Sequence, residues 1–225
     1  MQSDKPMKVG DVANSFVRSL LDTAVMMGVN RQQLLDKNNI SAAALEEGNR
    51  RLGLTHFMRL GFSAIKLLNE PAFGLYMGVN SNITRLGYAG FAAMTAPTLG
   101  EAFSVATRYE ALTSRCYRGQ SYIERTPSHF KLVFYSIAPY NEYTYFVVDA
   151  ILSGWKALAE WMTGRTDLVK EIQIEFPTPF YVDKYQELLN CPVSFSQEEN
   201  CVLFKPDAFD QPVIYHNPIM HRLML

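Results

Sequence analysis

The residues best suited to metal binding or nucleophilic catalysis are few and widely spaced in this chain. Cys116, Cys191 and Cys201 are odd in number and form no CxxC pair. This spacing predicts free thiols rather than disulfides or a zinc site. His216 and His221 are five residues apart, which does not place both on one helical face. We therefore expect no metal and no cofactor. A cysteine–histidine nucleophile pair stays open as an alternative, because such partners meet only in the fold.

Motifs that would indicate other enzymes do not occur. The sequence has no GxSxG, P-loop, GxGxxG or HExxH pattern. Gly87 and Gly90 form only a loose pair, which is more typical of close backbone packing than of a phosphate site. Glu198 and Glu199 fall at the tip of a predicted hairpin, where paired carboxylates are usually solvated. The sequence thus indicates a protein that is not an enzyme.

Aromatic and methionine side chains offer a binding site instead. The chain holds 14 Phe, 12 Tyr, 2 Trp and 10 Met, and a cavity lined by such residues suits a small organic molecule. Arg108 adjoins the apolar face of its predicted helix, where a guanidinium could bind a carboxylate ligand. The alternatives are an ion pair of Arg108 with Glu101 or Asp149, and plain core packing of the aromatics. The candidate ligand-binding residues are Phe91, Met94, Arg108, Tyr109, Tyr143, Phe146 and Trp155.

The N-terminal part is predicted to be helical. Apolar residues recur at helical spacing over residues 11–27. Asn30 can cap a short helix that ends at Lys37, and Ser41 can cap another short turn. Thr55 can cap a longer helix that Pro71 stops, and residues 72–77 form the next short helix. We expect a helical subdomain over residues 1–113.

A capping box marks the start of the next helix. Thr98 precedes Glu101 by three residues, so its hydroxyl can accept a hydrogen bond from the Glu101 amide. Pro97 keeps the preceding residue extended and gives a sharp entry into the helix. Leu99, Phe103 and the residues that follow at helical spacing form one apolar face.

After this helix, the spacing of apolar residues changes to the alternation that is typical of β-strands. Residues 116–125 and 130–137 predict two strands of a hairpin, followed by the longest helix over residues 141–162. In that helix Tyr143, Val147, Ile151 and Trp155 form an apolar ridge, beside a second one that contains Phe146. A strand, a helix and a second hairpin over residues 193–204 follow. We expect an α+β fold with a mostly antiparallel sheet and helices on one face, an α+β subdomain over residues 114–206 and a linker over residues 207–225.

Composition excludes several classes of partner. With 225 residues, a hydrophobic fraction of 48% and a charged fraction of 19%, the chain can bury a sizeable core. Its net charge of −1 argues against direct binding to the phosphate backbone of a nucleic acid. Residues 28–37 resemble the turn of a helix-turn-helix, but Arg31 and Lys37 give it only a thin basic face. The sequence has no apolar run long enough to span a membrane and no secretory signal, so we expect a cytoplasmic protein.

Three stretches in this order resemble one known family. They are Leu86-Gly87-Tyr88 with the APTLGEA sequence of residues 96–102 and Arg108-Tyr109; the IQIEF strand of residues 172–176 with Pro177 and Pro179; and the YQELLNCPVSF sequence of residues 185–195. Together they are similar to the N-terminal effector domain of AraC/XylS-type transcription regulators of the arabinose-binding-like branch. The resemblance covers residues 15–218. In such regulators a C-terminal helix-turn-helix domain follows, and we expect that domain to lie outside this chain.

The resemblance implies a sensor of a bacterial transcription regulator. It would bind a small organic effector between its lobes and control the missing DNA-binding domain through the linker. Fatty acids, amino acids and aromatic signals all fit an aromatic- and Met-lined site. A homodimer is expected, because regulators that read paired half-sites use two-fold symmetry. The alternative is a dimerisation or interaction module with no ligand, whose apolar surfaces are only core and interface.

Overall fold

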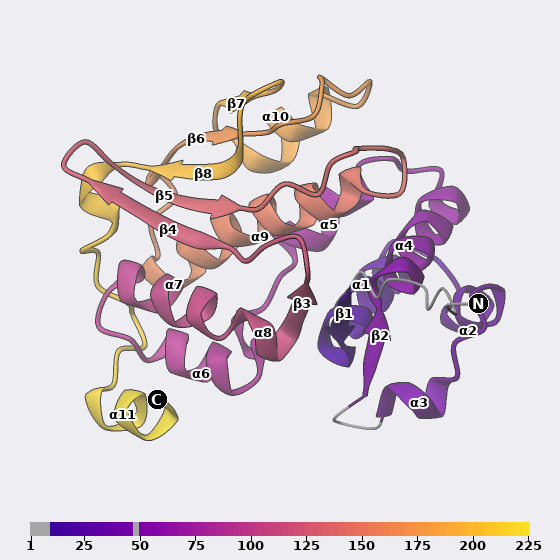
Figure 1. Cartoon of the computed structure of the whole chain (residues 1–225), viewed down its shortest axis with the longest axis horizontal. Coiled ribbons are helices and arrows are strands. Elements are labelled where there is room, and N and C mark those ends of the chain that lie inside the picture. The colour runs from indigo at the N-terminus through magenta and orange to yellow at the C-terminus, as the bar shows by residue number, and fades with distance from the viewer. Residues whose placement is uncertain (1–9, 47–49) are drawn as a thin grey trace, which may run out of the picture.

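The computed structural model describes residues 10–46 and 50–225, which form two packed parts (Figure 1). The N-terminal part carries helices on a short sheet, and the other part places a five-stranded sheet over helices. The elements of the N-terminal part are β1 (Gly10–Ala13), α1 (Asn14–Met26), α2 (Arg31–Lys37), α3 (Ala42–Glu46), β2 (Arg51–Gly53) and α4 (Leu54–Leu68).

Local capping explains most of these boundaries. The Asn30 side chain accepts a hydrogen bond from the Gln33 amide at 3.0 Å, which confirms the predicted start of α2. The prediction of a Thr55 cap for α4 is wrong, because the helix begins one residue earlier, at Leu54, with Gly53 as its N-cap. The predicted helix over residues 11–27 is shorter at its start, since residues 10–13 are the strand β1.

A chain of short helices connects the two parts. These are α5 (Phe73–Val79), the 3-10 helix η1 (Ile83–Leu86), α6 (Tyr88–Met94), α7 (Leu99–Arg108) and α8 (Glu110–Thr113). The amide of Glu101 donates to the Thr98 hydroxyl at 3.3 Å, so the predicted cap of α7 is confirmed. Gly87 lies at a φ of +61°, which turns the chain between η1 and α6.

A three-stranded sheet joins segments that are far apart in the sequence. Its order is β2-β1-β3, with β3 (Ser114–Cys116) antiparallel to β1. Asp11 pairs with Gly53 on one side and with Arg115 on the other. Cys116, predicted to begin the first hairpin, therefore pairs with Gly10 of the N-terminal part instead, and the hairpin strand begins only at Tyr122. A strand of three residues has too few positions to show an alternating pattern.

The larger sheet has the order β4-β5-β8-β6-β7. Its strands are β4 (Tyr122–Thr126), β5 (His129–Phe134), β6 (Val169–Gln173), β7 (Val193–Ser194) and β8 (Asn200–Phe204). The hairpin β4–β5 is confirmed, with Thr126 opposite His129 at its turn. The predicted second hairpin is wrong, because β8 lies between β5 and β6 and β7 runs parallel to β6.

Helices α7 and α9 (Tyr145–Thr163) cover one face of this sheet, as expected for an α+β fold (Figure 1). Phe103 of α7 contacts Phe130 and Phe204, whose rings stack with centroids 4.8 Å apart. Helix α9 ends at Thr163, and Gly164 caps its C-terminus in the left-handed conformation, with a φ of +69°. Helix α10 (Asp183–Leu189) precedes β7.

Two hydrophobic cores lie on either side of α5 and α9. The N-terminal core contains buried residues from Val12 to Met77 together with Phe146. The sheet core contains buried residues from Ala72 to Val213. Helices α5 and α9 pack closely on each other and contribute to both cores. The expected division at residue 113 stays a prediction.

The C-terminal segment is folded onto the sheet part. It contains the 3-10 helix η2 (Pro206–Ala208) and α11 (Pro218–Met224), which contacts α6. Ala208 and Val213 are buried, and the amide of Leu99 donates to the Gln211 carbonyl at 2.9 Å. The segment expected as a linker therefore packs against the start of α7.

Candidate functional site

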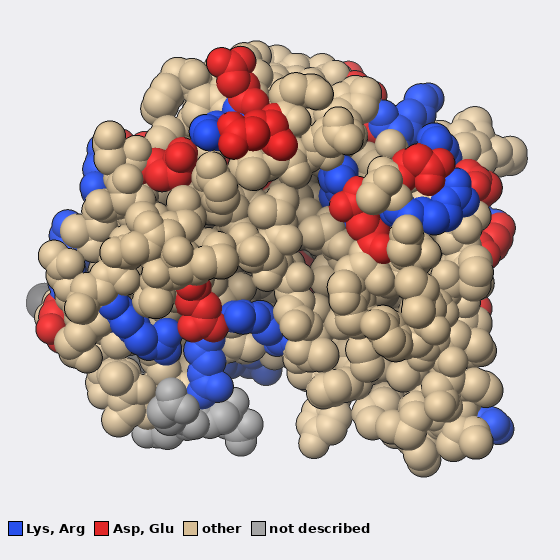
Figure 2. Space-filling view, turned by 180° about the vertical axis from the view of Figure 1, so that it is seen from behind, with Lys and Arg blue, Asp and Glu red and all other residues tan. Residues whose placement is uncertain are grey.

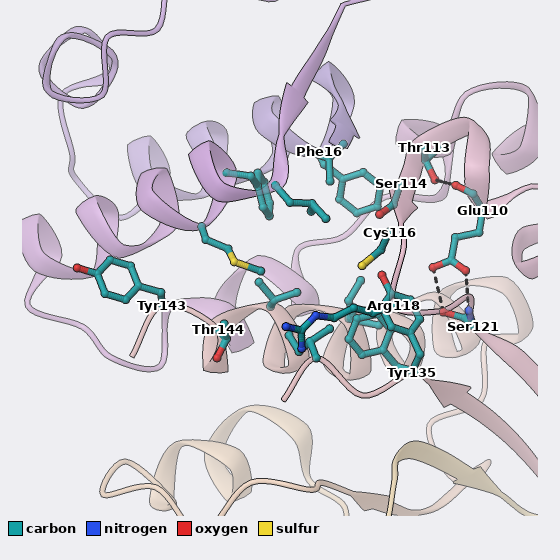
Figure 3. A pocket seen from close by; sticks show the side chains of 18 of the residues that line it. Phe16, Glu110, Thr113, Ser114, Cys116, Arg118, Ser121, Tyr135, Tyr143 and Thr144 are labelled. Carbon is teal, nitrogen blue, oxygen red and sulfur yellow. Dashed lines mark hydrogen bonds between the residues drawn. The ribbon is translucent and has the colours of Figure 1, made fainter. Parts of the chain in front are cut away.

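A cavity of about 710 Å³ lies between the two cores. Its lining includes residues of α4, β3, β5 and α9, and Figure 3 shows Phe16 of α1, Cys116 of β3 and Tyr135 around it. Its wall is mostly apolar, and both cores contribute, as expected of a small-molecule site. The apolar lining residues that define it are Val12, Phe16, Leu54, Phe57, Met58, Phe62, Leu86, Phe103, Leu132, Phe134, Val147, Ile151 and Trp155.

Helix α9 supplies one side of this cavity through a regular ridge. Val147, Ile151 and Trp155 of the predicted ridge recur every four residues on α9, so they lie on one face, and all three line the cavity. Tyr143 also lines the cavity, but it lies in the turn before α9, because the helix begins at Tyr145 and not at residue 141 as predicted. The Tyr143 ring lies 4.2 Å from that of Phe62, measured between centroids. Helix α4 thus meets the start of α9 at this end of the cavity.

A buried carboxyl group marks the opposite end. Glu110 accepts hydrogen bonds from the amide of Ser121 at 2.7 Å and from its hydroxyl at 3.0 Å (Figure 3). Burial raises the pKa of Glu110, and the two bonds from Ser121 only partly offset this. Burial, with Cys116 beside it, also raises the pKa of the Tyr135 phenol. This end of the cavity is therefore polar.

Two arginines supply the positive charge of the lining. Arg59 lies on α4 and Arg118 follows β3, and both side chains are exposed at the cavity. The guanidinium of Arg118 donates to the Ala138 carbonyl, which holds the side chain across the cavity wall. None of Glu110, Arg118 and Ser121 was predicted as a binding residue. Glu110 begins the short helix α8, whereas Arg118 and Ser121 lie in the loop between β3 and β4, within a segment that was predicted to be one strand.

A second, smaller cavity of about 90 Å³ adjoins the first. The two share Phe16, Leu86, Phe103, Ala106, Ile151 and Trp155 in their walls. Beyond Trp155 its lining continues along α9 to Leu158 and Met162. The interior space therefore extends from the cleft along the axis of α9.

The structure brings only two of the seven predicted binding residues to the cavity. Tyr143 and Trp155 line it. Phe91 is 40% exposed on α6, and Met94 and Tyr109 pack against the sheet core. Phe146 is buried on the other ridge of α9, where its ring lies 5.9 Å from that of Phe57. These four lie outside the cavity lining.

Arg108 also lies outside the lining and is exposed at the end of α7. Asp149, one of its expected partners, is instead buried against α10. Asp149 accepts hydrogen bonds from the Tyr181 hydroxyl at 2.9 Å and from the Tyr185 hydroxyl. Burial raises the pKa of Asp149 to about 7, against the lowering effect of these two bonds. Among the arginines that the structure describes, Arg59 and Arg118 line this cavity and Arg108 does not.

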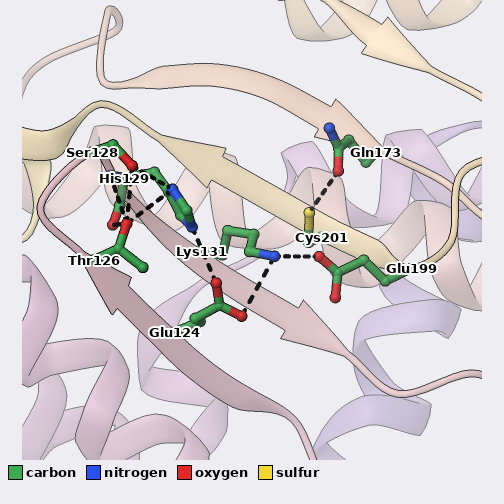
Figure 4. A network of polar contacts seen from close by, with 8 residues as sticks. All are labelled: Glu124, Thr126, Ser128, His129, Lys131, Gln173, Glu199 and Cys201. Carbon is green, nitrogen blue, oxygen red and sulfur yellow. Dashed lines mark hydrogen bonds and ion pairs between the residues drawn. The ribbon is translucent and has the colours of Figure 1, made fainter.

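A polar network on strands β4, β5 and β8 contains another thiol (Figure 4). Lys131 donates to Glu199 at 2.6 Å and lies 3.5 Å from Glu124, which also contacts the His129 ring. Cys201 donates to the Gln173 side chain at 3.5 Å, and burial raises its pKa to about 12. A thiol that stays protonated at neutral pH is a poor nucleophile.

Cysteine chemistry finds no support elsewhere either. Burial raises the pKa of Cys191 to about 11. His216 and His221 contact the carbonyls of Thr95 and Ala92. Across residues 10–46 and 50–225, no histidine has a cysteine as hydrogen-bond partner, and no cluster of His, Cys, Asp and Glu could hold a metal ion.

The surface carries charges of both signs. Acidic and basic side chains are interleaved on the face in Figure 2, where the molecule is hollowed between its two parts. Salt bridges such as Arg125–Asp210 at 2.7 Å and Lys184–Glu187 at 2.7 Å neutralise many of them. Among the helices that the structure describes, none is both long and apolar enough to cross a membrane.

Comparison with known proteins places this chain in one family. Residues 28–213 match the family described as the N-terminal arabinose-binding domain of AraC transcription regulators. The chain is 24% identical over 204 residues to an ornithine utilization regulator of Pseudomonas aeruginosa, covering 91% of this chain and 60% of that protein. It shares the fold of the transcriptional regulator CdpR from Pseudomonas aeruginosa, with a TM-score of 0.63, 15% identity, and coverage of 93% of this chain and 61% of that one. The chain thus spans about three fifths of the length of these relatives.

Proposed function

Because this chain belongs to the arabinose-binding domain family of AraC-type transcription regulators, we propose that it senses a small organic effector in the cleft between its two cores. The observation that carries the proposal is the lining of that cleft. Val12 and Phe57 come from the N-terminal core, and Leu132 and Phe134 come from the sheet core. A volume of about 710 Å³ is in the range of ligand pockets, about 300–1,000 Å³.

A ligand in this position would act by shifting populations. Since it contacts both cores at once, it stabilises the arrangement of the two that fits it best. In the proposed regulator, the C-terminal segment of residues 207–225 passes this change to a DNA-binding segment beyond the chain. Its contacts with the start of α7, which also supplies Phe103 to the cleft, support this route. The protein would act in the cytoplasm, as a homodimer, and without enzymatic activity.

Native mass spectrometry of the purified chain tests the proposal directly. We expect a bound small molecule that is released on denaturation, or else a rise in melting temperature with a member of a ligand panel. The panel should contain fatty acids, aromatic acids, L-arabinose and L-ornithine, because the last two follow from the family description and from the relative's name. A ligand-free mass together with no stabilisation by any member of the panel would contradict the sensor function.

A second candidate function is an interaction module that binds no ligand. The exposed apolar side chains of α11 favour it, with Ile219 at 65% and Leu223 at 73% exposure. The two candidates differ in the cleft, since an interaction module has no need of a cavity that both cores line. In an interaction module that associates through α11, Leu223→Ser should break self-association, whereas in a sensor Ala106→Phe should fill the cleft and abolish stabilisation by the ligand.

A further inference from the structure

We infer that the cleft selects an amphipathic carboxylate, whose carboxylate binds Arg118 and whose apolar body extends past Trp155 into the second cavity. The inference rests on the proposed function, because it names the chemical class of ligand for the same site. It assigns the anchoring charge to Arg118 and a supporting charge to Arg59. Three observations carry it: the charge balance of the lining, the free donors of Arg118 and the course of the apolar wall.

The charge balance of the lining is positive. Its charged residues are Arg59, Glu110 and Arg118. Both hydrogen bonds that Ser121 donates are accepted by Glu110, and burial favours the neutral form of its carboxyl group. Neither arginine forms an ion pair with any acid in residues 10–46 and 50–225. A bound anion would therefore face two arginines, whereas a bound amine would face one carboxyl group that already accepts two hydrogen bonds from Ser121.

The Arg118 side chain is positioned to receive a carboxylate. One terminal nitrogen donates to the Ala138 carbonyl, which restrains the long side chain. Figure 3 shows the guanidinium on the Thr144 side of the cavity, away from the Glu110–Ser121 pair. Its remaining N–H groups make no hydrogen bond within the described part of the chain. A planar guanidinium with free donors binds a carboxylate through two parallel hydrogen bonds.

The apolar wall of the cavity continues from Arg118 into the interior of the protein. Phe103, Ile151 and Trp155 belong to both cavities, so an apolar chain that enters the cleft can pass along their side chains. The second cavity is lined on α9 by the apolar Leu158 and Met162. Its one charged lining residue among those that the structure describes is Arg85, whose charge is paired with Asp22 at 3.1 Å. A free amino acid would need an acidic partner for its ammonium group, and a sugar would need many polar partners. An extended or aromatic body with one carboxylate matches the wall better than either.

Probes that differ only in the head group test the inference. We would titrate the chain with decanoate, 1-decanol and decylamine and follow Trp155 fluorescence in a Trp161→Phe background. Trp155 lines both cavities, while Trp161 stacks on Tyr215 at the surface and is 43% exposed. We expect decanoate to bind at least tenfold more tightly than decanol, and decylamine to bind most weakly. Octanoate should bind about fifteenfold more weakly than decanoate, since each buried methylene contributes about fourfold.

Substitution of Arg118 separates the charge from the apolar contacts. Arg118→Gln should weaken decanoate binding by about ten- to one-hundredfold and leave decanol binding unchanged. Arg118→Lys should lie between, because it keeps the charge but loses the two-bond geometry. Arg108→Gln is the matched control, since it removes an exposed arginine that lies outside the cavity, and its decanoate affinity should equal that of the parent chain.

Several results would overturn the inference. Equal affinity for decanoate and decanol, or tighter binding of decylamine, would show that the arginines do not select the head group. Equal loss of decanoate affinity in Arg108→Gln and Arg118→Gln would show a general charge effect. Absence of binding by all three probes would also overturn it. The proposed function would still stand in each case if native mass spectrometry found another class of molecule in the cleft, and it would fail only if none were found.

Discussion

The carboxyl group of Glu110 accepts two hydrogen bonds from one residue, Ser121, from its amide at 2.7 Å and from its hydroxyl at 3.0 Å. This contact joins α8 to the start of β4, on the side of the cavity away from Tyr143. Ser121 is 5% exposed, so the hydroxyl has no alternative partner in solvent. The pair therefore fixes the polar end of the cleft at the point where the two parts of the molecule meet.

Removal of the Ser121 hydroxyl should destabilise the fold. We expect Ser121→Ala to lower the free energy of unfolding by about 1–2 kcal/mol, because a buried carboxyl group loses one of its two donors. Urea denaturation followed by circular dichroism measures this change. Ser128→Ala is the control, since Ser128 is exposed in the β4–β5 turn, and it should change stability by less than about 0.5 kcal/mol. Equal effects of the two substitutions would contradict the structural role of the pair.

The buried carboxyl group of Asp149 should make stability depend on pH. Its pKa is about 7 in the folded chain, compared with about 4 in an unfolded chain. Between these values the folded state binds more protons than the unfolded state, so the free energy of unfolding falls as the pH rises from about 4 to about 7. We expect Asp149→Asn to flatten this fall, as measured by urea denaturation at pH 5 and pH 7.5.

Asp167 should contribute a pH dependence of stability that is opposite in sign to that of Asp149. The neighbouring Arg165 and Lys205 lower the pKa of Asp167, so its ionised form stabilises the fold at neutral pH and this contribution is lost in acid. Asp167→Asn should therefore weaken the chain slightly at pH 7.5 and leave the fall between pH 5 and pH 7.5 in place. A parent chain and an Asp149→Asn variant with the same pH profile would contradict the prediction for Asp149.

Close packing of α5 on α9 leaves no room for a side chain at Gly78. A Cβ atom there would lie 1.8 Å from the Ser153 hydroxyl and 2.7 Å from the Ala150 carbonyl oxygen. Since a backbone atom of α9 cannot move aside cheaply, Gly78→Ala should cost at least about 2 kcal/mol of unfolding free energy. Gly53→Ala is the matched control, because nothing lies within 4 Å of a Cβ atom there. Thermal denaturation of both variants should show a large fall only for Gly78→Ala, and equal falls would contradict the packing.

Phe146 connects the two cores from the helix that carries the cleft ridge. It belongs to the N-terminal core, although the other buried residues of α9 belong to the sheet core. We expect Phe146→Ala to lower stability by about 3–5 kcal/mol, because the ring is 1% exposed and its loss leaves a cavity. Phe91→Ala, at an exposed ring, should cost less than about 1 kcal/mol. A small effect of Phe146→Ala in urea denaturation would show that the contact between the cores is dispensable.

The sequence was most informative where a local signal decides the structure. The side chains of Asn30 and Thr98 cap their helices, and Gly164 ends α9, because each acts within one turn of its own position. The apolar ridge of Val147, Ile151 and Trp155 on α9 also followed from helical spacing alone. These features required no knowledge of distant contacts.

Other parts of the fold and site depend on distant contacts. The pairing of β3 with β1 joins residues about a hundred positions apart, and strands this short are too short for an alternating pattern to predict it. Spacing placed Phe146 on a ridge of α9 but could not show which ridge faces the cleft. The carboxylate-binding role expected for Arg108 fits Arg118 instead, whose position depends on a bond to Ala138.

Thiol reactivity should separate the three cysteines by their surroundings. Burial raises the pKa of Cys191 to about 11 and that of Cys201 to about 12, so both stay protonated at neutral pH and should react slowly with iodoacetamide. Cys116 lines the cleft and is half-buried. We expect it to react fastest, and a ligand in the cleft should slow its labelling. Mass spectrometry of labelled peptides measures all three rates, with the urea-unfolded chain as the control in which the rates converge. Faster labelling of Cys201 than of Cys116 in the folded chain would contradict the burial that this structure assigns to the sheet.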